Sequence, residues 1–363
     1  MRTPAVTPET PREPETNRVK GKIALALKIL VSVALVVWLL SQMDLGRFWE
    51  MVTHMSPAWL LLALFFKSCG VFASILRWKV LLRGQGMNVP LRFLASSFLE
   101  GRFFGTFLPS TIGLDAYRTY DLARYSGKTS SSISVILVDK VIGLFSLSFL
   151  VLVTAGAGAR IVGPRGVGIL LAVFLLPMAV SVGVLLHPGI FGRIADLKGW
   201  GKWAWTEKIG GFVRTLTVYK GQRGLLLQAM ALGIVIHLGT TLMYYGTALS
   251  VETEVSLKAI LFTGPLMITA TIIPLSIAGI GVREGTFIFF LSRTGIAAEP
   301  AALLAFLGFL VGEFISLGGG VIFMIRSHRY PSGKGDPSTE ERLSSFAPPP
   351  DSAASPLHVE PPE

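Results

Sequence analysis

Residues 167–186 read VGILLAVFLLPMAVSVGVLL, a run of 20 residues without a charged side chain. A helix of about 20 apolar residues is long enough to cross the roughly 30 Å of hydrocarbon in a bilayer. Similar runs recur along most of the chain, at 23–41, 59–76, 133–153, 225–249 and 301–325. The sequence therefore predicts an all-α polytopic membrane protein with about six to eight transmembrane helices.

The composition of the 363 residues supports this class, because 51% are hydrophobic and only 15% are charged. Soluble domains carry about 25% charged residues, so an ordinary cytosolic enzyme is excluded, as are disordered and collagen-like chains. The single cysteine, Cys69, allows no intrachain disulfide. Most of the net charge of +11 lies between the apolar runs. Such charge sets membrane orientation, and we expect no nucleic-acid partner.

The distribution of basic residues predicts the topology, because cytoplasmic loops are rich in Lys and Arg. Residues 1–22 carry five basic residues and are predicted to be a disordered cytoplasmic N-terminus. The stretch 77–92 has four basic residues and no acid, which is typical of a cytoplasmic loop, whereas 42–57 is predicted to be an outer loop. The membrane domain is expected over 23–328, followed by a disordered, Pro-rich cytoplasmic tail at 329–363. The protein is thus predicted to lie in the inner or plasma membrane.

Two segments, 93–117 and 259–293, are apolar but broken. The helix-breaking positions are Pro109 and Gly113 in the first segment, and Pro274, Gly279 and Gly281 in the second. Non-helical backbone is tolerated at membrane depth only inside protein or beside a wet cavity. A hairpin that enters from the cytoplasm at 93–117, and another from outside at 259–293, keeps the basic clusters inside.

The two breaks also resemble each other in sequence. Residues 107–118 read FLPSTIGLDAYR and residues 272–283 read IIPLSIAGIGVR, so that each has Pro, then Ile three positions later and Arg nine positions later. Inverted repeats with broken helices are typical of secondary transporters. The alternative is a chance resemblance between two Gly/Pro-rich kinks.

Charged residues near the breaks are the candidate site. A guanidinium binds phosphate through two parallel hydrogen bonds, so Arg118 and Arg283 are predicted to hold a phosphate headgroup, although Arg118 could instead be a cytoplasmic topology residue. Asp139 is expected to pair with Arg118 or Arg283, and Lys140 with a different partner; a purely structural ion pair is the alternative. The candidate substrate-binding residues are Arg118, Arg283, Glu284, Asp139, Lys140 and Asp115, and the candidate proton-relay residues are Glu100 and Glu313. No metal-ligand spacing or nucleotide-binding motif is present, and no catalytic residue, metal or cofactor is expected.

Four motifs resemble one known family: LRWK at 76–79, the segment 107–118, DKVIG at 139–143 and IPLSIAGIGVREG at 273–285. They are similar to the flippase-like membrane domain of lysylphosphatidylglycerol synthases, which also occurs in stand-alone YbhN-type proteins. The family usually has Gly-Gly-Asp at 113–115 and Glu-Arg at 139–140, where this chain has Gly-Leu-Asp and Asp-Lys. The resemblance implies movement of a phospholipid or a polyprenyl-linked lipid between leaflets.

The soluble aminoacyl-transferase domain of the full-length synthases is expected to be absent, so the chain is predicted not to be an enzyme. Two alternatives stay open. One is an intramembrane lipid-modifying transferase built on Glu100, Arg102, Asp115 and Arg118, and the other is an accessory subunit beside a lipid-synthesis enzyme. Membrane lipids are the expected partners, and the sequence does not decide the oligomeric state.

Overall fold

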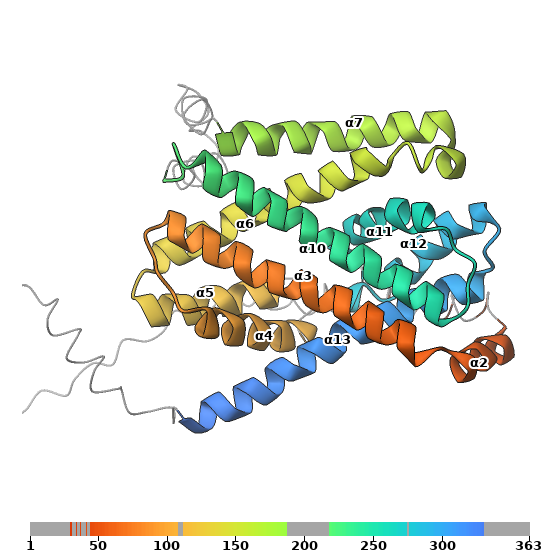
Figure 1. The fold of residues 1–363 in the computed structure, drawn as a ribbon, viewed down its shortest axis with the longest axis horizontal. Helices are drawn as coiled ribbons and strands as arrows, with labels where there is room; N and C mark the ends of the chain where they lie inside the picture. Colours follow the sequence, from red (N-terminus) through yellow and green to blue (C-terminus); the bar gives the residue numbers. More distant parts are fainter. Residues whose placement is uncertain are drawn as a thin grey trace, which may run out of the picture. The chain divides into compact units, whose positions relative to one another are not determined.

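The computed structural model describes residues 44–107, 112–186, 218–273 and 276–329, together with the single positions 30, 34, 37 and 41. All regular elements in these ranges are helices, which confirms the predicted all-α class (Figure 1). They are α2 (Leu45–His54), α3 (Pro57–Gly84), α4 (Leu91–Phe107), α5 (Ile112–Ser126), α6 (Thr129–Thr154), α7 (Ala159–Leu186), α10 (Arg223–Ser250), α11 (Leu257–Ile272), α12 (Val282–Leu291) and α13 (Ala298–Arg329), with short 3-10 turns at Ile277–Gly279 and Ser292–Thr294.

Several predictions fall outside the described residues. These are the terminal segments 1–22 and 330–363, most of the first apolar run at 23–41, and the two prolines Pro109 and Pro274. The chain divides into two compact units, Met1–Ile322 and Phe323–Glu363. The second unit contains the last turns of α13.

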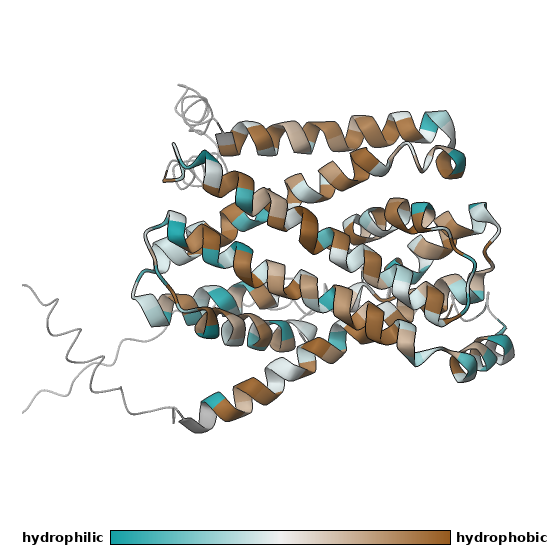
Figure 2. Ribbon diagram, in the orientation of Figure 1, coloured by the Kyte–Doolittle hydropathy of each residue, from teal (hydrophilic) through white to brown (hydrophobic). Residues whose placement is uncertain are grey.

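Five of the described helices are long and apolar enough to cross a membrane: α3, α6, α7, α10 and α13. They correspond to five of the apolar runs in the sequence, and Figure 2 shows apolar residues along their whole length. Two details differ from the prediction. Helix α3 continues to Gly84, so Arg77 lies inside the helix rather than in a basic loop. The segment 42–57, which was predicted to be an outer loop, contains helix α2, whose first N–H groups are capped by the Asp44 carboxylate.

Helices α3 and α10 pack against each other along most of their length. Glycines remove the side chains that would separate the two backbones. A Cβ at Gly239 would lie 2.8 Å from the Phe66 carbonyl oxygen, and one at Gly70 would lie 3.2 Å from that of Ile236. Small residues allow this close approach in membrane helices. The contact brings the middle of α3, around Lys67, against the middle of α10.

The two broken segments fold as helical hairpins, as predicted: α4 packs on α5, and α11 packs on α12. Their arms contain 17, 15, 16 and 10 residues, fewer than the roughly 20 that a membrane crossing requires. Gly101 and Gly105 of α4 lie directly against Leu114 of α5, which keeps the first hairpin tight.

Each hairpin has an apolar core of its own. The first core joins α4 and α5 to the C-terminal half of α3 and the N-terminal halves of α6 and α10. The second joins α11 and α12 to the opposite ends of α3, α6 and α10 and to the start of α13. The hairpins therefore pack at opposite ends of the same long helices, which supports the predicted inverted arrangement.

The helices that follow the two breaks begin at different points relative to the sequence repeat. Gly113 was predicted to lie in the first break, but this was wrong, because it is the second residue of α5. The second break continues as far as Gly281, since Ala278, Gly279 and Gly281 all have positive φ values of 54°, 73° and 81°. Only Gly adopts such values without strain, so the helix cannot resume before Val282. Gly279 and Gly281 are thus confirmed as break residues.

Candidate functional site

Three basic side chains from different helices approach one another in the middle of the membrane domain. Lys67 of α3 is within electrostatic range of Arg102 from the first hairpin, Arg283 from the second hairpin and Glu313 of α13. We call these four residues, together with Glu284, the central cluster. It is the point where both hairpins meet the long helices.

The members of the central cluster are held mainly by neutral groups. Lys67 Nζ donates to Thr240 Oγ1 at 3.2 Å. Arg102 Nη2 donates to the Gly312 carbonyl oxygen at 3.0 Å and to Ser316 Oγ at 3.1 Å. Glu313 accepts a hydrogen bond of 2.6 Å from Thr106, one turn beyond Arg102 on α4. Among the described residues, no carboxylate forms an ion pair with Lys67 or Arg102.

Arg283 is fixed to the long break of the second hairpin. Its Nη2 donates to the Ala278 carbonyl oxygen at 2.9 Å, and its guanidinium lies over the ring of Phe309, 4.7 Å from the centroid. The first contact holds the left-handed backbone of Ala278 in place. Burial leaves Arg283 only 9% exposed, yet its Nη1 has no hydrogen-bond partner among the described residues. The Nε of Arg102 is likewise buried without a hydrogen-bond partner among the described residues.

Glu284, which was predicted to bind substrate, has two contacts within the second hairpin. One carboxylate oxygen accepts the Gly281 N–H at 2.7 Å, which caps the N-terminus of α12. The other lies 3.8 Å from Arg283 Nη1. Glu284 thus stabilises the break and balances part of the charge of its neighbour.

A second group of charges, which we call the peripheral network, joins α3, α5 and α6. Arg77 Nε lies 2.7 Å from Asp139 Oδ1, and Arg118 Nη2 lies 3.3 Å from Asp139 Oδ2. Arg118 Nη2 also reaches Asp115 at 2.6 Å, and Asp115 in turn pairs with Lys140. The predicted pairing of Asp139 with Arg118 is confirmed, and so is a separate partner for Lys140.

Arg118 is deeply buried in this network. It is 3% exposed, and its guanidinium lies between the rings of Trp78 and Phe98 at 5.2 and 5.4 Å. Arg118 forms ion pairs with two carboxylates, Asp115 and Asp139, whereas Arg283 has, among the described residues, only Glu284 at 3.8 Å. The two arginines that match in the sequence therefore have no partner in common. The two arginines have different partners because they lie at different positions in their helices. Arg118 lies in the second turn of α5 and Arg283 in the first turn of α12.

Lys67, Arg102 and Arg77 were not among the substrate-binding residues predicted from the sequence, and Arg102 entered only the alternative transferase site. Arg77 was assigned to a basic loop, although its position in an unbroken helical pattern was a signal against that. Lys67 and Arg102 are charges in the middle of apolar segments, and a charge at such depth is by itself a sign of a functional or paired residue. Only the packing of the hairpins against α3 shows that they belong together.

Glu100, Arg102 and the Asp115–Arg118 pair of the alternative transferase site have different partners. Tyr117 donates a hydrogen bond to Glu100, which is completely buried between α4 and α5. Arg102 points instead to α13, and Asp115 and Arg118 belong to the peripheral network. Within the described part of the chain, no group of three or more His, Cys, Asp or Glu side chains could hold a metal ion.

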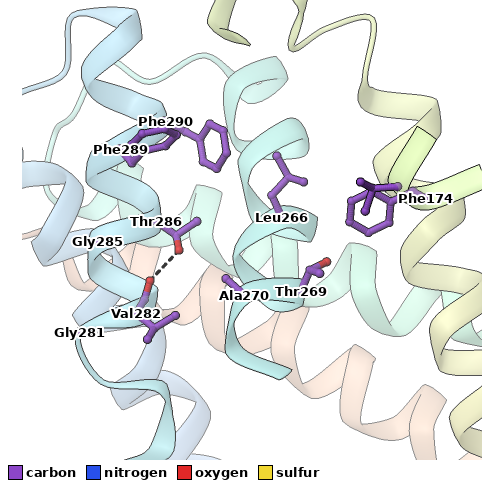
Figure 3. A pocket seen from close by; sticks show the side chains of 11 residues that line it. Phe174, Leu266, Thr269, Ala270, Gly281, Val282, Gly285, Thr286, Phe289 and Phe290 are labelled. Carbon is purple, nitrogen blue, oxygen red and sulfur yellow. Dashed lines mark hydrogen bonds between the residues drawn. The ribbon is translucent and has the colours of Figure 1, made fainter. Parts of the chain in front are cut away.

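An open apolar groove of about 590 Å³ lies on the other face of α12. Figure 3 shows its lining, with Phe289 and Phe290 on α12 opposite Leu266 on α11 and Phe174 on α7. Gly281, Val282, Gly285 and Thr286 complete the α12 side, where Thr286 donates to the Val282 carbonyl oxygen. Arg283 and Phe287 face the opposite way and are buried. One short helix therefore separates the groove from the central cluster.

Residues 25–319 match the family described as the lysylphosphatidylglycerol synthase TM region. The chain belongs to this family. No curated protein matched the chain. Membership of the lysylphosphatidylglycerol synthase TM family, together with five membrane-length helices, makes this a multi-pass membrane protein of lipid metabolism or transport. The matched range contains every residue of the central cluster and of the peripheral network.

Proposed function

We propose that this protein moves a phosphate-bearing lipid from one membrane leaflet to the other, with the headgroup bound at the central cluster. Lys67, Arg102 and Arg283 are the binding residues in this proposal, so Arg102 and Lys67 replace Arg118 of the prediction made from sequence. Both termini are proposed to be cytoplasmic, as the basic loops predict.

The observation that carries the proposal is the set of unused donors in the central cluster, where no carboxylate of the described residues forms an ion pair with Lys67 or Arg102. Arg77 and Arg118 of the peripheral network also have donors without a hydrogen-bond partner in the described ranges, but Asp139 lies at ion-pair distance from both. Arg102 Nε and Arg283 Nη1 are buried without a hydrogen-bond partner among the described residues. A buried donor without a partner costs free energy, and phosphate oxygens are strong acceptors for guanidinium groups. A phosphate between Lys67, Arg102 and Arg283 would satisfy these donors and balance their charge.

The apolar groove supports the same proposal. A membrane lipid combines a charged headgroup with hydrocarbon chains, and α12 presents a charged face to the central cluster and an apolar face to the groove. A chain in the groove and a headgroup at Arg283 would lie on two sides of one ten-residue helix. The left-handed residues Ala278, Gly279 and Gly281 join this helix to α11 and provide a natural hinge.

We further propose that movement occurs without chemical change of the lipid. The transferase alternative needs a paired acid and base, and Glu100 and Arg102 have separate partners on α5 and α13. The accessory-subunit alternative is tested by the same experiment, because an accessory subunit moves no lipid when it is purified alone.

The test is lipid translocation in proteoliposomes that contain the purified chain and a panel of labelled lipids with different headgroups. Wild type is expected to move one lipid class. Arg283→Ala and Arg283→Lys are both expected to lower the rate about 100-fold, because a lysine makes neither the planar contact with Phe309 nor two parallel bonds to phosphate. Lys67→Met should also lower the rate, whereas Lys258→Met, which changes an exposed lysine at the start of α11, should leave it unchanged.

The outcomes separate the three functions. Wild type that moves no lipid, or Arg283→Lys with full activity, would contradict the proposal. A headgroup altered after incubation would favour the transferase. Circular dichroism and size-exclusion chromatography of each variant show whether a lost rate reflects lost folding.

A further inference from the structure

We infer that the central cluster selects a lipid whose headgroup carries a single net negative charge on a phosphodiester, in preference to a zwitterionic lipid or a lipid diphosphate. This inference rests on the function proposed above and names the substrate class of the same site. It follows from a count of the charges that meet there.

The central cluster contains three basic groups, Lys67, Arg102 and Arg283, and two acidic groups, Glu313 and Glu284. With all five groups ionised, one positive charge is left over. Burial of net charge in a low-polarity environment costs free energy, so the site is most stable when its ligand cancels that single charge. A monoanion does so. A zwitterion leaves the complex positive, and a diphosphate makes it negative.

The other charged groups nearby do not change this count. Glu100 lies two residues before Arg102, which places the two side chains about 200° apart around α4, and Tyr117 of α5 donates to Glu100. The peripheral network sets Asp115 and Asp139 against its two buried arginines. Its third basic group, Lys140, is 54% exposed, so solvent screens that charge. His237 of α10 is within electrostatic range of Lys67, but it adds no charge as a neutral imidazole.

Binding of the anion favours the charged forms of the basic groups in the central cluster. A phosphate between three basic groups favours the charged form of each, because opposite charges stabilise one another at short range. Lys67 can then use the ammonium donors that Thr240 does not accept. Glu313 lies beside them and accepts a hydrogen bond from Thr106. The lipid-bound cluster therefore keeps one excess positive charge for the phosphodiester.

Glu313 gives the inference a direct test. Glu313→Gln keeps the side-chain shape and an acceptor for Thr106, but it removes a negative charge and so raises the net charge of the central cluster by one. Lys67→Met removes a positive charge and so lowers the net charge of the central cluster by one. The probes are three labelled lipids in proteoliposomes: phosphatidylglycerol with one negative charge, zwitterionic phosphatidylcholine, and a prenyl diphosphate. Wild type should move phosphatidylglycerol at least about tenfold faster than either of the others, a difference that corresponds to about 1.4 kcal/mol.

The variants should shift this preference in opposite directions. Glu313→Gln is expected to change the ratio of rates about tenfold in favour of the diphosphate, and Lys67→Met about tenfold in favour of phosphatidylcholine. Lys258→Met should keep the wild-type ratios. Binding of the three lipids to each purified variant in nanodiscs gives the same preferences where transport is too slow to measure.

Failure of the inference differs from failure of the proposed function. If movement depends on Arg283 but wild type moves the three lipids equally, or Glu313→Gln keeps the wild-type ratios in both transport and binding, charge selection is overturned and lipid movement stands. If wild type neither moves nor binds any of the lipids, the proposed function is overturned as well.

Discussion

The central cluster and the peripheral network contain similar residues, but their basic side chains have different partners. In the peripheral network, Asp139 lies at ion-pair distance from both Arg77 and Arg118. In the central cluster, Arg102 donates to a carbonyl and a hydroxyl, and Lys67 to a hydroxyl. Neutral acceptors satisfy hydrogen bonds without cancelling charge. Arg118, which lies close to two carboxylates, is therefore a structural residue. Arg102, with neutral partners, and Arg283, with one carboxylate at 3.8 Å, are candidate ligand residues.

The largest expected effect on stability comes from replacing the carboxylate shared by two arginines. Asp139→Asn leaves Arg77 and Arg118 buried without their shared counter-ion, and removal of one partner from a buried pair costs about 3–5 kcal/mol. Glu313→Gln is the matched change in the central cluster and should cost less than about 1 kcal/mol, because an amide oxygen still accepts from Thr106. Unfolding in mixed micelles measures both. Equal losses would mean that the two clusters do not differ in kind.

A smaller effect is expected where α13 meets α4. A Cβ at Gly319 would overlap the carbonyl oxygen of Leu99, whereas one at Gly318 meets nothing within 4 Å. Gly319→Ala should therefore push α13 away and weaken the contacts of Arg102 with Gly312 and Ser316, at a cost of about 1–3 kcal/mol. Gly318→Ala is the control. Loss of lipid movement in Gly319→Ala alone would link the central cluster to this contact, and identical stability of the two variants would argue against it.

Lys140 should matter least. Its side chain is 54% exposed even though it pairs with Asp115, and exposed ion pairs contribute about 0–1 kcal/mol. Lys140→Met is expected to lower the free energy of unfolding by less than about 1 kcal/mol and to leave lipid movement unchanged. A large loss of movement would restore Lys140 to the binding residues that the sequence predicts.

Orientation can be tested without any expected loss of stability. In a Cys69→Ser background, single cysteines replace the exposed residues Lys128, before α6, and Glu252, after α10. The basic loops predict that Lys128 lies in the cytoplasm and Glu252 outside. A membrane-impermeant maleimide applied to intact cells should thus label only the second. Labelling of both would contradict the proposed pair of inverted hairpins.

Much of the fold could be predicted from residue patterns alone. The uncharged run at 167–186 and its equivalents predicted five helices that the structure contains, because length and hydropathy are properties of the local sequence. The two breaks were recognisable from Pro and Gly within apolar segments. Helix ends were less accurate, as α3 shows: a basic residue ends an apolar run, but it does not end a helix when a carboxylate on another helix faces it.

The site was predicted only in part, since pairing depends on contacts distant in sequence. The sequence repeat aligned Arg118 with Arg283, but α12 begins only at Val282, after positive φ values at 278, 279 and 281. Arg283 therefore lies in the first turn of its helix and Arg118 in the second turn of α5. Arg118 meets Asp139 of α6, whereas Arg283 approaches Lys67 of α3. None of these partners is close in the chain.

The sequence by itself determined the membrane class, the family, the number of long helices in the described ranges and the presence of two breaks, because each is set by composition or short motifs. Tertiary structure decided which charges neutralise one another. Electrostatic energy depends on distance and on burial, and the packing of two hairpins at opposite ends of α3, α6 and α10 sets both. That packing surrounds Arg118 with carboxylates and leaves Lys67, Arg102 and Arg283 with one positive charge in excess.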